Sequence, residues 1–152
     1  MTNDFYGEFQ HILNSKNQII IPAKFRQILG DRFVISKGFH KCLFIYTQAG
    51  WNALIEKTEK ILLADSGGQW FIRMFFSSVY DCEQDNNGRI VIPASLREYA
   101  QIEKDVVSIG VKNRIELWDK TIWTSYCADQ DSVELPPFIN NDMLQKLMEL
   151  GI

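Results

Sequence analysis

Two short polar turns carry the side chains best suited to recognition at a surface. Asp85 and Arg89 lie four residues apart in the second turn, and Asn14 and Gln18 occupy the same positions 71 residues earlier. An arginine can bind a carboxylate or a phosphate through two parallel hydrogen bonds, whereas glutamine has no charge. Lys16 adds a positive charge to the first turn. These residue types favour recognition of a polar partner over covalent chemistry.

Each turn opens a longer pattern that occurs twice, over residues 14–26 and 85–97. The pattern is a polar turn, three β-branched residues, Pro-Ala, and an arginine four residues after the proline. A match of this density indicates an internal duplication. The turn residues tolerate the positive φ of tight hairpins, the β-branched residues favour a strand, and proline suits the first turn of a helix. The pattern therefore predicts a hairpin with an outward tip, followed by a short helix.

The sequence contains none of the common nucleotide-binding or hydrolase motifs. Its two histidines, His11 and His40, have no partner at the spacing of metal ligands. Cys42, Cys82 and Cys127 form no Cys-x-x-Cys pair, and we expect them to be buried free thiols in a reducing cytosol. The sequence thus predicts a protein that is not an enzyme and has no cofactor or metal site.

The bulk composition limits the choice of architecture and partner. A chain of 152 residues with 46% hydrophobic residues can form one ordinary domain or two very small ones. Each repeat is too short to bury a secure core alone, so we expect the two to pack on each other. No apolar stretch can span a bilayer, and the N-terminus has no signal-peptide pattern. The net charge of −3 excludes a strongly basic surface, but residues 14–26 hold three basic residues and no acidic one.

The remaining elements also follow the duplication. Residues 32–36 and 42–46 are predicted strands, and they match residues 105–109 and 114–118 in the second copy. Trp51 and Trp123 follow at an offset of 72, and each is expected to open a helix and to anchor the core.

Two further segments contain helical patterns. Residues 51–62 have helical apolar spacing, and residues 69–77 are apolar on most sides, with Arg73 expected to be embedded in an ion pair. No counterpart of this middle segment is expected elsewhere in the chain. Residues 141–150 form a predicted amphipathic helix. This helix docks on its own chain, docks on a neighbour, or forms a loosely held tail.

Over residues 5–126, the order and spacing of these motifs resemble the MraZ family of bacterial transcription regulators. The resemblance rests on Gly7-Glu8-Phe9, residues 20–26, residues 42–46, residues 85–93, and residues 116–120 with Trp123. It implies a mainly β fold with short helices, in which two AbrB/MraZ-like swapped-hairpin halves, each a double-split β-barrel, pack into one unit. The expected boundaries are 5–52 for repeat 1, 53–78 for a helical connector between the repeats, 79–126 for repeat 2, and 127–152 for a linker and C-terminal helix.

The resemblance also implies a function. It indicates a cytoplasmic, nucleoid-associated regulator, most often a repressor, that binds short direct repeats of double-stranded DNA in the promoter of a division and cell-wall gene cluster. The expected assembly is a homo-oligomeric ring, without membrane or small-molecule partners. The DNA-binding residues implied for this chain are Asn14, Lys16, Gln18, Lys24, Arg26, Asp85, Arg89 and Arg97.

The first turn departs from the family motif, Asp-x-x-x-Arg. Asp85 and Arg89 keep the motif, whereas Asn14 and Gln18 replace both of its residues in the first copy. Arginine pairs with guanine O6 and N7, and glutamine pairs more naturally with adenine. Gln18 therefore indicates either a changed base preference or a tip that no longer binds well.

Other interpretations stay open on the sequence alone. The tips are equally consistent with solvated hairpins in which Arg89 pairs only with Asp85. Arg26 and Arg97 could equally form structural pairs at contacts between repeats or subunits. A rival function is a ring-forming interaction protein that has lost DNA binding and docks a protein partner. An AbrB-like antitoxin fits poorly, because those chains carry one copy of the unit and this chain carries two.

Overall fold

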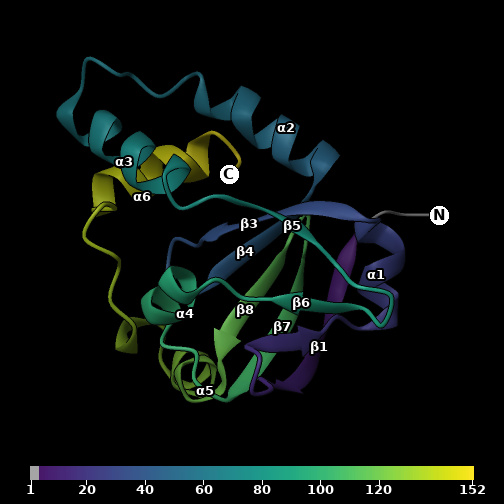
Figure 1. The fold of residues 1–152 in the computed structure, drawn as a ribbon. Helices are drawn as coiled ribbons and strands as arrows, with labels where there is room; N and C mark the ends of the chain where they lie inside the picture. Colours follow the sequence, from purple (N-terminus) through teal and green to yellow (C-terminus); the bar gives the residue numbers. More distant parts are fainter. Residues whose placement is uncertain (1–3) are drawn as a thin grey trace.

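The computed structural model describes residues 4–152 (Figure 1). The first half contains β1 (Phe5–Ile12), β2 (Gln18–Ile20), α1 (Ala23–Leu29), β3 (Arg32–Lys37), β4 (Leu43–Thr47), α2 (Gln48–Thr58) and α3 (Ser66–Phe76). The second half contains β5 (Tyr80–Glu83), β6 (Arg89–Val91), α4 (Ala94–Ala100), β7 (Asp105–Lys112), β8 (Ile115–Asp119), α5 (Lys120–Ala128), the 3₁₀ turn η1 (Gln130–Ser132) and α6 (Asn141–Glu149).

The two halves exchange strands. One antiparallel sheet has the order β1-β7-β8-β4-β3-β5, so the first strand of each half pairs with the third strand of the other half. A second sheet consists of β2 and β6, again one strand from each half. The expectation that the two copies pack on each other is confirmed.

The prediction of two simple hairpins is wrong in one respect. Each polar turn closes locally, through bonds from the Asn14 N–H to the Gln18 carbonyl (3.0 Å) and from the Asp85 N–H to the Arg89 carbonyl (2.9 Å). Beyond the turn the flanking strands separate, since β1 pairs with β7 and β2 pairs with β6. Pairing between the halves brings Ile19 opposite Ile90 and buries both side chains.

The fold class differs from the expected mainly β fold. Helices hold more of the described residues than strands do, so the fold is mixed α/β with antiparallel sheets. The excess comes from α2, α3 and α6, which lie outside the duplicated turn-strand-helix pattern. The strand pairings give two separate sheets, and they do not show the double-split barrel that the resemblance implies.

The six-stranded sheet has a hydrophobic core on each face. One core lies between the sheet and the unit formed by the ribbon β2–β6 and helices α1 and α4, and it contains the ribbon residues Ile19 and Ile90. The other core lies under α2, α3 and α6 and contains Trp51, Phe71 and Leu147. Figure 1 shows these three helices together at the top of the molecule, with α1, β6 and α4 across its lower half.

The prolines position the short helices as the sequence predicts. Helices α1 and α4 begin directly after Pro22 and Pro93, and α1 covers the predicted residues 23–29. The helices that contain the two tryptophans begin three residues earlier than expected, because Thr47 and Asp119 cap them.

The two tryptophans differ in burial. Trp51 is a core anchor, only 8% exposed. Trp123 is half-buried and packs against the core that contains Trp118, while its indole N–H donates to Glu8 Oε1 (2.8 Å), so the core prediction holds only in part for this residue.

Helix α3 corrects two predictions for the middle segment. Arg73 is exposed, and it forms no ion pair within residues 4–152. The buried pair Phe71 and Phe75 recurs 72 residues later as Met143 and Leu147 of α6. Helix α3 of the middle segment therefore has a similar helix, α6, after the second repeat, and the sequence did not reveal it because only the apolar spacing is shared.

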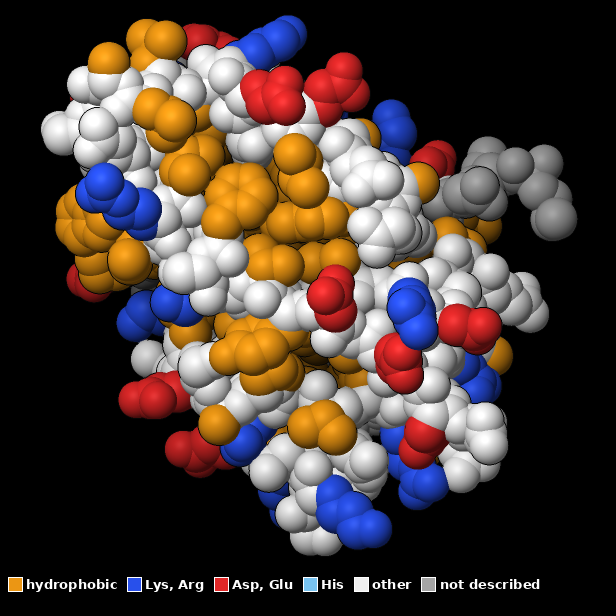
Figure 2. All heavy atoms as spheres, turned by 45° about the horizontal axis from the view of Figure 1, so that its top comes forward, with side chains coloured by type: hydrophobic (Ala, Val, Ile, Leu, Met, Phe, Trp, Pro, Cys, Tyr) orange, Lys and Arg blue, Asp and Glu red, His pale blue; other side chains and the backbone are white. Residues whose placement is uncertain are grey.

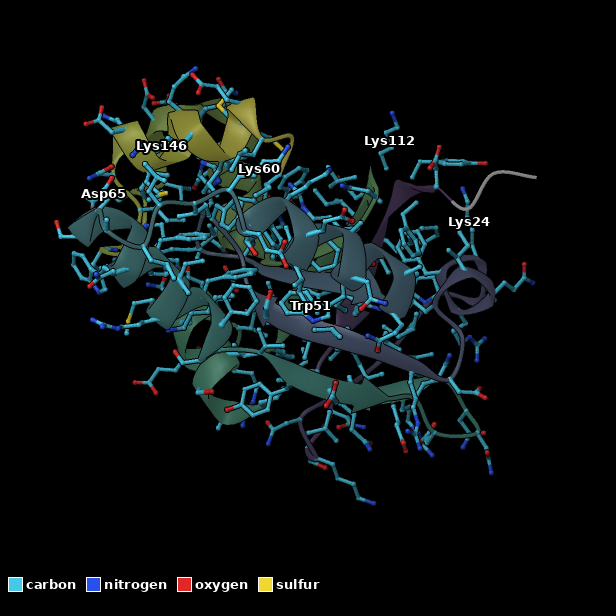
Figure 3. All side chains as sticks on the ribbon, turned by 90° about the horizontal axis from the view of Figure 1, so that it is seen from above. Lys24, Trp51, Lys60, Asp65, Lys112 and Lys146 are labelled. Atoms are coloured by element: carbon cyan, nitrogen blue, oxygen red, sulfur yellow. The ribbon has the colours of Figure 1, made fainter. Side chains whose placement is uncertain are left out.

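Helix α6 docks on its own chain. Asn140 caps it by accepting from the Met143 N–H (2.7 Å), and Lys146 Nζ lies 2.8 Å from Asp65 Oδ2 at the start of α3. Figure 3 shows Lys146 and Asp65 beside each other, on the opposite side of the molecule from Lys24. Within the described chain, this excludes the loosely held tail.

The cysteines are less uniform than predicted. Cys42 is buried, Cys82 is half-buried and Cys127 is exposed. Burial raises the pKa of the Cys42 thiol well above its ordinary value and that of Cys82 to about 11, so neither thiol is a ready nucleophile. No helix among residues 4–152 has the length and apolar character needed to span a membrane.

Candidate nucleic-acid interface

The ribbon β2–β6 brings the two predicted turns into one surface. Its register pairs Gln18 with Val91, Ile19 with Ile90, and Ile20 with Arg89. Because alternate side chains of a strand point to opposite faces, Ile19 and Ile90 face the core and the other four residues face outward. The two turns lie at opposite ends of this ribbon, since its strands are antiparallel.

The outward face of the ribbon is accessible. Ile20 is 57% exposed and Val91 is 52% exposed, although both are aliphatic. Gln18 and Arg89 are half-exposed beside them. The face therefore has two polar positions on one diagonal and two aliphatic positions on the other.

The second turn holds Arg89 through Asp85. Asp85 Oδ1 accepts from the backbone N–H groups of Asn87 (2.8 Å) and Arg89 (2.9 Å), while its Oδ2 accepts from Arg89 Nε (2.9 Å). Hydrogen bonding from the Arg89 backbone N–H, followed by the other donors, lowers the pKa of the Asp85 carboxyl. The ion pair uses only Nε among the guanidinium donors that are recorded, which leaves the terminal nitrogens available for a further contact.

The first turn has the same hydrogen-bond geometry, but its paired side chains, Asn14 and Gln18, are uncharged. Asn14 Oδ1 accepts from the backbone N–H groups of Lys16 (3.0 Å) and Gln18 (2.9 Å), and Asn14 Nδ2 donates to Gln18 Oε1 (3.0 Å). Asparagine thus closes the turn as aspartate does and also orients the residue four positions later. The Gln18 amide nitrogen still has two hydrogens to donate.

Each turn is hydrogen-bonded to the other half of the chain. The Gly88 carbonyl accepts from the Ile21 N–H (2.8 Å), and the Asn17 carbonyl accepts from the Ile92 N–H (3.0 Å). Gly88 has φ +76°, and a Cβ on this residue would clash with the guanidinium group of Arg26. Arg26 therefore packs directly over the second turn.

The other predicted basic residues have different surroundings. Arg97 Nε donates to the Ile92 carbonyl (2.9 Å) in the same repeat. Lys24 Nζ lies 3.5 Å from the centre of the Tyr6 ring, a cation–π contact. Lys16 is exposed in the first turn. Arg26 therefore packs against the other repeat, in line with the structural role predicted as its alternative. Arg97 instead forms a hydrogen bond within its own repeat.

Charge is concentrated on the two copies of the pattern. Residues 14–26 and 85–97 together contain five basic residues and one acidic residue, a net charge of +4. Because the whole chain carries −3, all other residues together carry −7. The two copies of the pattern are therefore a positively charged part of an acidic chain, which favours an anionic partner at the ribbon over a cationic one.

The polar residues of this face were all predicted from the sequence, whereas Ile20 and Val91 were not. Both belong to uninterrupted aliphatic triplets, Ile19-Ile20-Ile21 and Ile90-Val91-Ile92, which show no alternation of polar and apolar residues. The duplication itself could have indicated these two residues, since both copies place an aliphatic residue two positions after Gln18 or Arg89. No cluster of His, Cys, Asp or Glu among the described residues could hold a metal ion.

Comparisons with known proteins agree with this duplicated architecture. The family model "MraZ protein, putative antitoxin-like" matches the chain twice, over residues 5–66 and 75–136. Three similar proteins are each named transcriptional regulator MraZ. That of Clostridium acetobutylicum is 43% identical over 148 residues, covering 97% of this chain and 99% of the relative. That of Acetivibrio thermocellus is 46% identical and that of Natranaerobius thermophilus 45%, each covering 84% of this chain and, respectively, 89% and 90% of the relative.

The two matches cover most of the chain and coincide with the exchanged halves of the fold. The predicted absence of enzymatic activity is consistent with these relatives, whose name describes regulators. The chain belongs to the MraZ family of transcriptional regulators and contains two tandem MraZ repeats.

Proposed function

We propose that this protein regulates transcription by binding specific DNA sequences, with the β2–β6 ribbon placed in the major groove. The observation that carries the proposal is the outward face of the ribbon, which presents Gln18 and Arg89. Both belong to the two segments that together carry a net charge of +4. The major groove admits a two-stranded β-ribbon and displays a distinct pattern of donors and acceptors for every base pair.

The polar residues of the face divide into two roles in this proposal. Arg89, oriented by Asp85, and Gln18, oriented by Asn14, face the base edges. The four remaining cations, Lys16, Lys24, Arg26 and Arg97, lie on the first turn and on helices α1 and α4, and they neutralise phosphates. Phosphate contacts fix the register of a protein on DNA, and base contacts supply the sequence preference.

The assembly and the target extend the proposal. The relatives are named transcriptional regulators, which supports action at a promoter. We propose, from the family resemblance alone, that the outcome is repression of a division and cell-wall gene cluster. We also propose a cytoplasmic, nucleoid-associated protein. We propose that the two repeats at 5–52 and 79–126, the connector at 53–78 and the C-terminal part at 127–152 form one unit, which the exchange of strands between the repeats supports. The double-split barrel type of this unit follows from the family resemblance alone.

A ring of identical subunits is supported by exposed apolar residues on the side away from the ribbon. Figure 2 shows hydrophobic side chains gathered over the face that carries α2, α3 and α6. Leu62, Leu63, Trp70 and Met148, which are between 50% and 70% exposed, lie on these helices or the loop between α2 and α3. An apolar surface of this kind is typical of a protein–protein contact.

The experiment is a salt-titrated binding assay with the intact protein and the DNA directly upstream of its own gene. Wild type is compared with Arg89→Ala and with Lys60→Ala, which removes an exposed cation from the loop after α2 (Figure 3). We expect Arg89→Ala to lose roughly 1–3 kcal/mol of discrimination against scrambled DNA, and Lys60→Ala to bind as wild type does.

Binding should weaken with salt, because each neutralised phosphate adds about −0.9 to the slope of log affinity against log salt. Equal binding of promoter and scrambled DNA by the wild type at low salt would overturn the proposal. If Arg89→Ala keeps the promoter preference, the proposed role of the ribbon in reading the DNA sequence is wrong.

A further inference from the structure

A groove runs along the last residues of β1, between the ribbon and the start of α5, and we call it the β1 groove. Its volume is about 630 Å³, within the range of sites that bind small molecules. Apolar side chains from β1, β2 and β7 line it together with two charged residues, namely Phe9, Ile12, Ile20, Val106, Asp105 and Lys120. The groove therefore combines an apolar wall with charges of both signs.

The duplication supplies a second groove at the equivalent place beside β5. This β5 groove has a volume of about 350 Å³ and is lined by Arg32, Phe33, Gln48, Asp81, Cys82 and Glu83. The strand register pairs Arg32 with Glu83 here, and these side chains form an ion pair (3.3 Å). The same register position of the β1 groove pairs Asp105 with Ile12. The β1 groove thus presents an aliphatic side chain beside a carboxylate where the β5 groove has an ion pair.

Asp105 and Lys120 are neighbours that do not pair with each other. The ladder between β7 and β8 ends at Val106 and Asp119, so Asp105 and Lys120 are the next residues of the two chain segments. No ion pair among residues 4–152 includes either of them. Lys120 Nζ instead donates to Gln10 Oε1 over 3.3 Å. The groove therefore holds a carboxylate and an ammonium side by side, and both can form further hydrogen bonds.

We propose that the β1 groove binds a small apolar α-amino acid, with its ammonium at Asp105 and its carboxylate at Lys120. The two charged groups of an α-amino acid are separated by a single carbon atom, so they match protein charges that lie side by side. Its side chain would cover Ile12 and Ile20, which are 67% and 57% exposed, and would remove apolar surface from water. This ligand departs from the expectation that the protein has no small-molecule partner.

Ile20 connects this groove to the ribbon. It lies on the outward face of β2, where it pairs with Arg89. This part of the inference rests on the proposed DNA binding, because a ribbon placed in the major groove would cover Ile20. The amino acid and DNA should therefore compete, and each should lower the affinity of the other by the same factor.

The first test measures binding to the intact protein by titration calorimetry, without DNA. L-Leucine is compared with glycine, which lacks the side chain, with leucinamide, which lacks the carboxylate, and with N-acetyl-leucine, which lacks the ammonium. Leucine should bind at least about tenfold more tightly than glycine, because its side chain becomes buried. Removal of either charge should weaken binding by about two- to fivefold, as expected for an exposed ion pair.

Variants of the protein assign these contacts. Lys120→Met should bind leucine and leucinamide equally, and Asp105→Asn should bind leucine and N-acetyl-leucine equally. Ile12→Ser should weaken the binding of leucine, whereas Leu62→Ser, which changes an aliphatic residue that is 70% exposed between α2 and α3, is the matched control. All four residues are exposed, so these variants should fold.

The second test repeats the salt-titrated assay on promoter DNA with saturating leucine. We expect weaker DNA binding by the wild type and no effect of leucine at the same concentration on Ile12→Ser. If leucine binds but leaves the affinity for DNA unchanged, the proposed competition is wrong.

The outcomes separate this inference from the proposed function. If leucine does not bind, or if glycine, leucinamide and N-acetyl-leucine bind as tightly as leucine, the proposed site is wrong, whatever the DNA assay gives. If the protein has no preference for promoter DNA, the proposed function fails, and calorimetry still tests the site. Binding of leucine that depends on Lys120, Asp105 and Ile12, together with weaker DNA binding in its presence, supports the inference.

Discussion

The side chain at the start of each turn has two tasks that this protein allows us to separate. Asp85 closes its turn by accepting two backbone N–H groups and holds Arg89 with its second oxygen. Asn14 closes the other turn with the same two backbone bonds and holds Gln18 through its amide nitrogen. Turn closure thus needs only an oxygen acceptor, whereas control of the recognition residue needs a group matched to it in charge.

At this scale, acid should affect the two turns differently. Hydrogen bonds, first from the Arg89 backbone N–H, lower the pKa of Asp85 below its ordinary value of 3.8. A carboxyl whose pKa is depressed on folding contributes stability above its unfolded pKa, and this contribution is lost as the pH falls through the folded pKa. Asp85→Asn should therefore lower the thermal midpoint at pH 7 only slightly, and it should show a smaller fall in midpoint than wild type between pH 5 and pH 2.

The matched variant for this prediction is Asn14→Asp, which places the same carboxyl in the equivalent frame. It should gain acid sensitivity in the same pH window, measured by circular dichroism melting at each pH. Identical pH profiles for wild type and both variants would show that the turn carboxyl contributes nothing to stability.

The elements show how a short duplicated pattern becomes one molecule. Neither copy can cover its own aliphatic strand, so β2 and β6 pair with each other and their inward isoleucines join one core. After each copy, a further helix covers the opposite face of the six-stranded sheet. These are α3, with Phe71 and Phe75, and α6, with Met143 and Leu147.

A prediction follows for α6, which the sequence left open between a docked helix and a loose tail. Leu147 is 0% exposed, whereas its neighbour Met148 is 64% exposed on the same helix. Leu147→Ala should lower the free energy of unfolding by about 2–5 kcal/mol, and Met148→Ala should change it by less than about 0.5 kcal/mol. Urea unfolding of the two variants measures both values, and equal effects would contradict the docking of α6.

The sequence predicted these elements unevenly, for physical reasons. Proline and the polar turns act locally, so the helix at residues 23–29 and both turns could be placed from a few neighbouring residues. The choice of strand partner depends on which pairing buries more apolar surface across the whole chain. The local pattern therefore could not predict the exchange of β1 and β5, and only the family resemblance, with its swapped hairpins, implied an exchange. Ile20 and Val91 were missed because an aliphatic triplet does not reveal which of its members faces outward.

At the scale of the whole molecule, charge and apolar surface lie on different sides. The two copies of the turn pattern carry +4 and the remaining residues carry −7. The apolar surface over α2, α3 and α6 lies across the six-stranded sheet from the ribbon (Figures 1 and 2). An oligomer built through the apolar side would leave every ribbon free, so that several could bind one DNA molecule.

This separation predicts strong dependence on the number of sites. A linked second contact is intramolecular, and it can increase the overall affinity by about 10²–10⁴ without any new type of contact. DNA with two correctly spaced promoter repeats should therefore bind far more tightly than DNA with one repeat. The gain should vanish in Trp70→Glu, which adds a charge to the apolar side and should reduce the mass of the oligomer measured by light scattering.

Because Trp70 is 50% exposed, its replacement should leave the fold and the binding of a single repeat unchanged. If the variant keeps the gain from the second repeat while it is monomeric, the gain does not come from linked ribbons, and assembly has no role in DNA binding.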